Sequence, residues 1–190
     1  MPKIILASAS PRRQELLKQI KIAHQVQIVD LDETPKLNET PADYVQRLAF
    51  EKALACKEKF APKLPILAAD TSVIFDNQIL GKPENENDAK AMLQQLSGNT
   101  HQVFTAIALF GKAQHTALSV TEVTFKTLSD AQIHAYWQSG EPLGKAGSYA
   151  IQGIASAFIE KINGSFSGVM GLPLFETAQL LALEGIEVLA

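Results

Sequence analysis

A short segment near the N-terminus combines hydroxyl groups with two guanidinium groups. Ser8, Ser10, Arg12 and Arg13 follow an apolar run, residues 3–7, that is typical of a buried strand. Ser10 is a favourable N-cap, and the proline after it suits the first position of a helix. The N–H groups at the start of that helix and the arginines then face the same space, which favours a bound phosphate. The alternative interpretation is a capped helix with two solvated arginines.

Carboxylates follow two other stretches that have strand patterns. Glu33 lies in an acidic turn, residues 30–35, after the alternating polar and apolar residues 24–29. Asp70 comes directly after the apolar run of residues 64–69, which predicts a buried strand that ends there. Open α/β sheets present ligand-binding groups at the carboxyl ends of their strands, so Asp70 is a candidate site residue. A solvated loop is the alternative interpretation of the acidic turn.

Two lysines are candidates for neutralising a bound anion. The pattern predicts a helix from Pro41 to about Lys59, and Lys52 falls in the middle of its apolar face whereas Lys57 falls on the other side. A lysine directed inwards needs an anionic partner, although its stem could also carry it to the surface. Lys82 lies between a glycine, which frees the backbone, and a proline, which fixes it, as in a loop that holds one side chain near a ligand.

The segment 145–153 is rich in small residues and contains one aromatic residue and the amide of Gln152. Such a loop lets a ligand approach the backbone while an amide reads a donor and acceptor edge. A plain hairpin connection is the alternative. His101, His115 and His134 are scattered singly, and we interpret them as ordinary surface or core residues and not as metal ligands.

The remaining segments predict a mixed α/β sheet with flanking helices. The two longest strand patterns form an antiparallel pair, which argues against an all-parallel sheet. The expected strands are residues 72–75 with 78–80, 103–110 with 117–125, and 154–162; the expected helices are residues 85–96, 129–138 and 172–184.

Composition narrows the classes of function. A chain of 190 residues with 46% hydrophobic residues can form one domain or two small lobes that share a cleft. The formal net charge of -3 argues against binding along a nucleic-acid polymer. With one cysteine, no apolar run of membrane-spanning length and no signal-peptide pattern, we expect a cytoplasmic protein with no membrane partner.

Seven short motifs, taken in chain order, resemble one family. They are Ser-x-Ser-x-Arg-Arg-x-Glu at residues 8–15, Asp-Glu-Thr-Pro at 32–35, Glu-Lys-Ala at 51–53, Ala-Asp-Thr at 69–71, Gly-Lys-Pro at 81–83, Leu-Ser-Gly at 96–98 and Gly-Leu-Pro at 171–173. The chain resembles the Maf family of nucleoside triphosphate pyrophosphatases over nearly its whole length. The resemblance implies a single domain, residues 1–190, with an inosine-triphosphatase-like α/β fold whose two lobes flank a nucleotide cleft. It also implies hydrolysis of a nucleoside triphosphate to the monophosphate and pyrophosphate with a divalent metal, Mg²⁺ or Mn²⁺.

The resemblance extends to one branch of the family. The branch that acts on dTTP and UTP typically has arginine, threonine and glutamine where this chain has Arg12, Thr71 and Gln152, whereas the branch that acts on 7-methyl-GTP usually has tryptophan in place of Arg12. The match implies that modified or canonical pyrimidine nucleotides are the substrates, in a house-cleaning role. Gln152 is chemically suited to the edge of thymine or uracil, where one N–H lies between two carbonyls.

The resemblance assigns roles to the charged residues. Glu33 and Asp70 would hold the metal, with Asp70 also a candidate general base. The residues implied to contact or neutralise the triphosphate are Ser8, Arg12, Arg13, Lys52 and Lys82.

Two alternative functions and the oligomeric state stay open at this point. The chain could be a 7-methyl-GTP pyrophosphatase of the same family, or a nucleotide-binding regulator of septum formation without turnover. A pure binding module has no need of two carboxylates facing a tetra-anion, because they repel it unless a metal intervenes. The resemblance also leaves a homodimer open.

Overall fold

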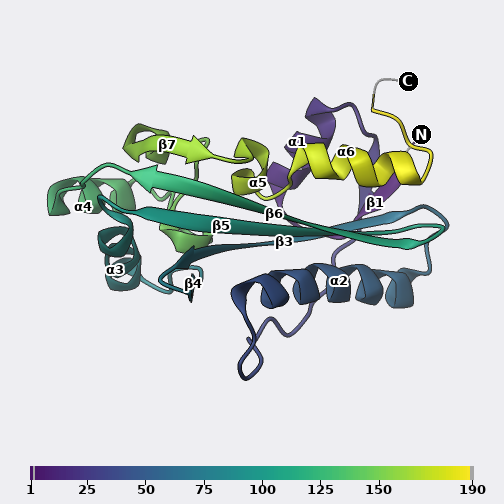
Figure 1. Cartoon of the computed structure of the whole chain (residues 1–190), viewed down its shortest axis with the longest axis horizontal. Helices are drawn as coiled ribbons and strands as arrows, with labels where there is room; N and C mark the ends of the chain where they lie inside the picture. The colour runs from purple at the N-terminus through teal and green to yellow at the C-terminus, as the bar shows by residue number, and fades with distance from the viewer. Residues whose placement is uncertain (2, 189–190) are drawn as a thin grey trace.

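The computed structural model describes residue 1 and residues 3–188, and within these residues seven strands form one mixed sheet (Figure 1). The strand order is β2-β1-β3-β5-β6-β7, with the short β4 paired to β3. Strands β1 and β2 run parallel to their neighbours, and the remaining pairs are antiparallel. The strands are β1 (Ile4–Leu6), β2 (His24–Val26), β3 (Ile66–Phe75), β4 (Gln78–Leu80), β5 (Thr100–Phe110), β6 (Gln114–Phe125) and β7 (Ile159–Asn163). The mixed sheet that the sequence predicts is therefore confirmed.

Helices cover both faces of the sheet. In Figure 1, α2 lies alone below the sheet, α1 and α6 lie above it, and α3 and α4 lie at the far end. The helices are α1 (Pro11–Gln19), α2 (Pro41–Phe60), α3 (Glu86–Leu96), α4 (Asp130–Gln138), α5 (Phe166–Met170) and α6 (Leu174–Leu183), with the 3₁₀ turns η1 (Ala146–Ser148) and η2 (Ile154–Phe158). Among the described residues, no helix has both the length and the apolar character that crossing a membrane requires.

Strand β3 is buried on both faces because its side chains alternate between two cores. Ile66 and Ala68 pack in the cluster that contains the apolar face of α2, whereas Leu67 and Ala69 pack with α1 and α6 on the other face. The same alternation places Asp70 on the α2 side. Burial on both faces accounts for the near-continuous apolar run in the sequence.

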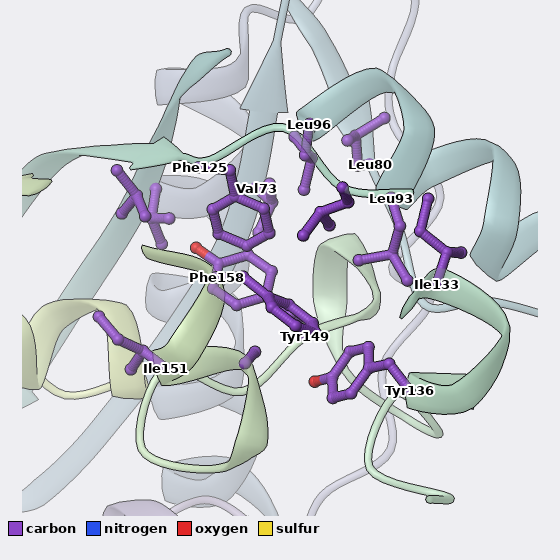
Figure 2. Close-up of a cluster of buried hydrophobic side chains, with 14 residues drawn as sticks. Val73, Leu80, Leu93, Leu96, Phe125, Ile133, Tyr136, Tyr149, Ile151 and Phe158 are labelled. Atoms are coloured by element: carbon purple, nitrogen blue, oxygen red, sulfur yellow. The ribbon is translucent and has the colours of Figure 1, made fainter. Parts of the chain in front are cut away.

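A third core lies at the far end of the sheet, where the helices α3 and α4 meet the loops that follow α4. Figure 2 shows its aromatic centre, in which Phe125, Tyr149 and Phe158 pack beside Tyr136. The rings of Phe125 and Tyr149 meet edge to face with centroids 4.9 Å apart. This core supports the segment that includes Tyr149.

The structure corrects the expected end of the central strand. Asp70 does not follow the strand: β3 runs unbroken from Ile66 to Phe75, so Asp70 is in its middle. Between Leu67, the last residue paired with β1, and Val73, the first paired with β4, the described residues provide no strand partner on that edge. The other edge pairs with β5 throughout. Asp70 therefore lies beside a gap in the pairing and not at the end of a strand.

Two other expected strands are shorter than the sequence predicts. The strand over residues 24–29 is limited to His24–Val26, because its neighbour β1 ends at Leu6. The strand over residues 154–162 begins as η2 and becomes β7 only at Ile159. Its first amides donate to the carboxylate of Glu141 and not to a neighbouring strand.

Candidate active site

A cleft opens at the gap in the pairing of β3. Its walls come from the first turn of α1, from α2, from the middle of β3 and from the loops after β4, α4 and α5. Four basic and two acidic side chains line it: Arg12, Arg13, Lys52, Lys82, Glu33 and Asp70. The cleft thus has a positive excess within a chain whose formal net charge is -3, as a site for a polyanion requires.

Lys52 joins the two carboxylates of the cleft. Its Nζ lies 2.6 Å from Oε1 of Glu33 and 2.7 Å from Oδ1 of Asp70. Lys52 and Asp70 are largely buried, with 14% and 10% of their side-chain surface exposed, whereas Glu33 is 45% exposed. The inward direction of Lys52 and its anionic partners, expected from the helical pattern, are confirmed.

The contact with Lys52 changes the pKa of Glu33. Burial alone would raise the pKa of Glu33, but the hydrogen bond and charge of Lys52, with the charges of Lys82 and Arg13, outweigh it and hold the pKa below its usual value. Glu33 is therefore ionised at neutral pH. The carboxylates of Glu33 and Asp70, from different parts of the chain, thus converge on one ammonium group.

Arg13 joins three elements around the other side of the cleft. Its guanidinium donates to the carbonyl of Gly171 at 2.7 Å, to Oγ of Ser8 at 3.0 Å and to Oγ1 of Thr71 at 3.3 Å. Thr105 donates in turn to Thr71 Oγ1 at 2.9 Å. Burial lowers the pKa of Arg13, and the charge of Asp70 opposes that effect. The network fixes the guanidinium beside the cleft.

The start of α1 differs in one detail from the sequence prediction. Ser10 is the N-cap residue, but within the described chain its hydroxyl makes no capping hydrogen bond. Ser8 contacts the start of the helix in another way: its Oγ accepts from the amide of Ser10 at 3.2 Å and from the guanidinium of Arg13 at 3.0 Å. Arg12 lines the cleft nearby, and burial lowers its pKa against the opposing charge of Glu15.

The other end of the cleft is apolar. It is lined by Val73, Leu80, Val103, Tyr149 and Ile151, among others. A planar base would fit such a surface, with the charged end left for phosphates.

Gln152 does not join the other predicted site residues. Its side chain is exposed, and the residues that line the cleft include its neighbour Ile151 but not Gln152 itself. In this structure the loop presents Tyr149 and Ile151 to the cleft and Gln152 to solvent. The proposed role of Gln152 therefore requires the loop to rearrange around a bound base.

Residues 3–184 match the family model described as Maf-like protein. The chain belongs to the Maf family. Relatives include the dTTP/UTP pyrophosphatase of Colwellia psychrerythraea, 54% identical over 192 residues that cover 96% of this chain and 89% of the relative. The dTTP/UTP pyrophosphatase of Nitrosomonas europaea is 51% identical over 198 residues, 97% of this chain and 96% of the relative.

Solved structures similar to this Maf chain include the Staphylococcus aureus Ham1 protein. The TM-score is 0.47, with 14% sequence identity over 64% of this chain and 71% of the Ham1 chain.

The residues of the Maf chain that could hold a divalent metal are Glu33 and Asp70. No group of three or more His, Cys, Asp or Glu residues in the described part of the chain is placed to hold a metal ion. Mg²⁺ in phosphate-handling sites is commonly held by one or two carboxylates, with substrate phosphates and waters as its other ligands. Both carboxylates here contact a single cation, the ammonium of Lys52. A pair of convergent carboxylates therefore fits a metal of that kind.

Two residues of this site were missed by reasoning from the sequence. Tyr44 lines the cleft and donates its hydroxyl to the carbonyl of Glu33 at 2.8 Å. Its position one residue before Val45 on the apolar face of α2 was the available signal, because a buried tyrosine usually needs a partner for its hydroxyl. Thr105 supports Thr71 from β5, and only the register of β3 with β5 brings the two together.

Proposed function

We propose that this chain is a nucleoside triphosphate pyrophosphatase that hydrolyses dTTP and UTP to the monophosphate and pyrophosphate. The observation that carries the proposal is the convergence of Glu33 and Asp70 on Lys52 within a cleft that has a positive excess. The Maf relatives of about half-identical sequence carry the same activity in their names. The match of these relatives along nearly the whole chain supports a single catalytic domain.

In the proposed mechanism the triphosphate lies along the charged end of the cleft. Arg12, Arg13 and Lys82 neutralise its oxygens, so that charge developing on the leaving pyrophosphate is stabilised. A divalent cation held by Glu33 and Asp70 would supply further charge neutralisation at the phosphates.

Lys52 and Asp70 have linked roles in this proposal. Release of Lys52 from the two carboxylates frees its ammonium for a phosphate oxygen. It also frees Oδ1 of Asp70 to accept a proton from the water that attacks the phosphorus, as a general base does. The water oxygen then bonds to the α-phosphorus. The bond from the α-phosphorus to the oxygen that bridges it to the β-phosphorus breaks, and pyrophosphate leaves.

Base selection is proposed to depend on Gln152, Arg12 and Thr71. A carboxamide bonds to a carbonyl and to the adjacent N–H of thymine or uracil, and a base with the wrong edge leaves buried polar groups unpaired. CTP is then a weaker substrate than dTTP or UTP, because its edge has a donor where one carbonyl would be.

The experiment that tests this function measures the release of pyrophosphate and monophosphate from dTTP, UTP, CTP, ATP, GTP and 7-methyl-GTP with Mg²⁺ or Mn²⁺. We expect dTTP and UTP to have the highest kcat/KM. A preference for 7-methyl-GTP would overturn the assignment of the branch. Tight binding without release of pyrophosphate from any of them would instead support a nucleotide-binding regulator.

A further inference from the structure

The segment that carries Glu33 lies outside the helices and strands. Residues 30–39 form neither helix nor strand, and the side chain of Glu33 is 45% exposed. A carboxylate on such a segment would ordinarily sample many positions, because backbone and side chain both retain freedom. Local hydrogen bonds at the amides of Thr34 and Lys36 shape this segment, and contacts from α2 attach it to the rest of the fold.

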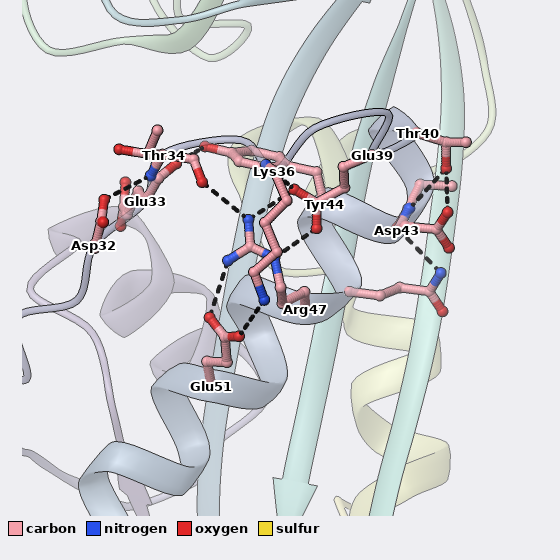
Figure 3. A network of polar contacts seen from close by, with 12 residues as sticks. Asp32, Glu33, Thr34, Lys36, Glu39, Thr40, Asp43, Tyr44, Arg47 and Glu51 are labelled. Carbon is pink, nitrogen blue, oxygen red and sulfur yellow. Dashed lines mark hydrogen bonds and ion pairs between the residues drawn. The ribbon is translucent and has the colours of Figure 1, made fainter.

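Arg47 of α2 binds this segment at two places. Its guanidinium makes a forked contact with the carboxylate of Glu39, from Nε at 2.5 Å and from Nη2 at 2.8 Å, and Nη2 also donates to the carbonyl of Thr34 at 3.2 Å (Figure 3). Its third nitrogen, Nη1, donates to Glu51 on the same helix at 3.0 Å. Only 14% of the Arg47 side chain is exposed. A planar fork held in this way restricts both the position and the direction of the segment.

Tyr44 fixes the segment one turn earlier on the same helix. Its hydroxyl donates to the main-chain carbonyl of Glu33 at 2.8 Å. The guanidinium carbon of Arg47 lies 5.5 Å from the centre of the Tyr44 ring, so the two side chains support each other. Burial, with the charge of Asp70, raises the pKa of Tyr44 to about 12, and the phenol therefore remains a donor at neutral pH.

We propose that Arg47 and Tyr44 are positioning residues that hold Glu33 opposite Asp70, so that the two carboxylates form one cation site. The inference rests on the proposed function, since it takes Glu33 to be a metal-holding residue. Lys52, which contacts both acids, lies five residues after Arg47 on the same helix. Helix α2 thus places both the partner of the carboxylates and the side chains that present Glu33.

The ion pairs of Arg47 persist at neutral pH. The hydrogen bond from Arg47 lowers the pKa of Glu39 to about 2, and the same contact raises the pKa of Arg47. Both partners are therefore charged under any condition in which the enzyme would be assayed.

The test is the affinity for Mn²⁺ in the presence of a non-hydrolysable α,β-imido analogue of dUTP, measured by electron paramagnetic resonance or calorimetry. Loss of a residue that orients a metal-holding side chain typically weakens metal affinity by about 10-fold to 100-fold. We expect Arg47→Ala and Tyr44→Phe each to weaken Mn²⁺ binding by about 10-fold, with Arg47→Lys between Arg47→Ala and the wild type.

Lys36→Ala is the matched control, because it removes the exposed 3.4 Å pair with Glu51 and leaves the fork of Arg47 in place. The inference is wrong if Arg47→Ala and Tyr44→Phe bind Mn²⁺ as tightly as Lys36→Ala does.

A double variant separates positioning from general damage to the fold. If Arg47 acts through Glu33, then Arg47→Ala added to Glu33→Gln weakens Mn²⁺ binding no further than Glu33→Gln alone. If the double variant instead shows the product of the two single fold-losses in Mn²⁺ affinity, Arg47 acts elsewhere and the inference is overturned. Should Arg47→Ala not fold, Tyr44→Phe combined with Glu33→Gln makes the same comparison, since it removes a single hydroxyl.

Mn²⁺ binding by Glu33→Gln distinguishes an error in the positioning role from an error in the proposed metal site. If Glu33→Gln binds Mn²⁺ as the wild type does, then Glu33 does not hold the metal and the proposed metal site itself is wrong. If Glu33→Gln weakens binding but the Arg47 and Tyr44 variants do not, only the positioning role is wrong.

Discussion

At the scale of single residues, the ammonium of Lys52 organises the charged end of the cleft. It contacts Glu33 at 2.6 Å and Asp70 at 2.7 Å, and two carboxylates so close to one point would repel each other without a cation between them. The residue could be singled out from the sequence because helical periodicity alone places it on the buried face of α2. Its partners could not be derived in the same way, since they come from segments that only the folded chain brings together.

Lys52→Ala should lower kcat/KM for dTTP by about 10²-fold to 10³-fold, the usual cost of removing one donor that stabilises developing charge. Lys57→Ala provides the control, because Lys57 is exposed on the same helix and makes no ion pair among the described residues. We expect that control to stay within about twofold of the wild type. Steady-state kinetics compares the two variants, and equal losses would contradict the assigned role of Lys52.

His101 gives a prediction about pH and stability. It is buried, its Nε2 lies 2.8 Å from the hydroxyl of the cleft residue Tyr149, and burial lowers its pKa to about 4. Because the unfolded chain takes up this proton near pH 6.5, the free energy of unfolding should fall by up to about 1.4 kcal/mol per pH unit between pH 6.5 and 4. Urea denaturation should show that this part of the pH dependence is absent in His101→Leu. A His101→Leu curve parallel to the wild type would contradict it.

At the scale of elements, the loop after α4 depends on Glu141. Its carboxylate accepts from the amide of Ile154 at 2.8 Å, from that of Ala155 at 3.2 Å and from the hydroxyl of Tyr136 at 2.8 Å. These bonds start η2 where the apolar pattern predicts a strand. The sequence could not show this, because the contact with Glu141, and not the local composition, decides whether this segment forms a strand or a 3₁₀ turn.

Gly153→Ala should destabilise this loop. A Cβ at Gly153 would overlap the carboxylate of Glu141, so the side chain that holds the loop would have to move. We expect a loss of about 1–3 kcal/mol in the free energy of unfolding. Gly81→Ala is a control in which a Cβ meets nothing within 4 Å and should change stability little. Chemical denaturation of both variants decides the matter, and equal stabilities would show that Glu141 adapts at no cost.

At the scale of the whole molecule, the site exists because β1 and β4 leave part of one edge of β3 without a strand neighbour. Helices α1 and α2 lie on opposite faces of the sheet (Figure 1), and their side chains Arg13 and Lys52 both reach the cleft at this gap. The mixed sheet and the helices other than the short α5 were predictable from periodicity and capping signals. The gap was not, because one of its two borders is the pairing of β3 with β1, a strand distant in the sequence. The outward direction of the Gln152 side chain could not be predicted either, since a loop of small residues has no periodic pattern.

The most direct test of the central claim is product formation from dTTP by the wild type and by Asp70→Asn, with Mg²⁺ or Mn²⁺ present. Asparagine keeps the shape of the side chain and removes its charge and its capacity to accept a proton. We expect dTMP and pyrophosphate in equal amounts from the wild type. Asp70→Asn should lose most of the turnover, about 10²-fold or more, while it still binds the triphosphate. Near-normal turnover by Asp70→Asn, or release of orthophosphate in place of pyrophosphate by the wild type, would contradict the central claim.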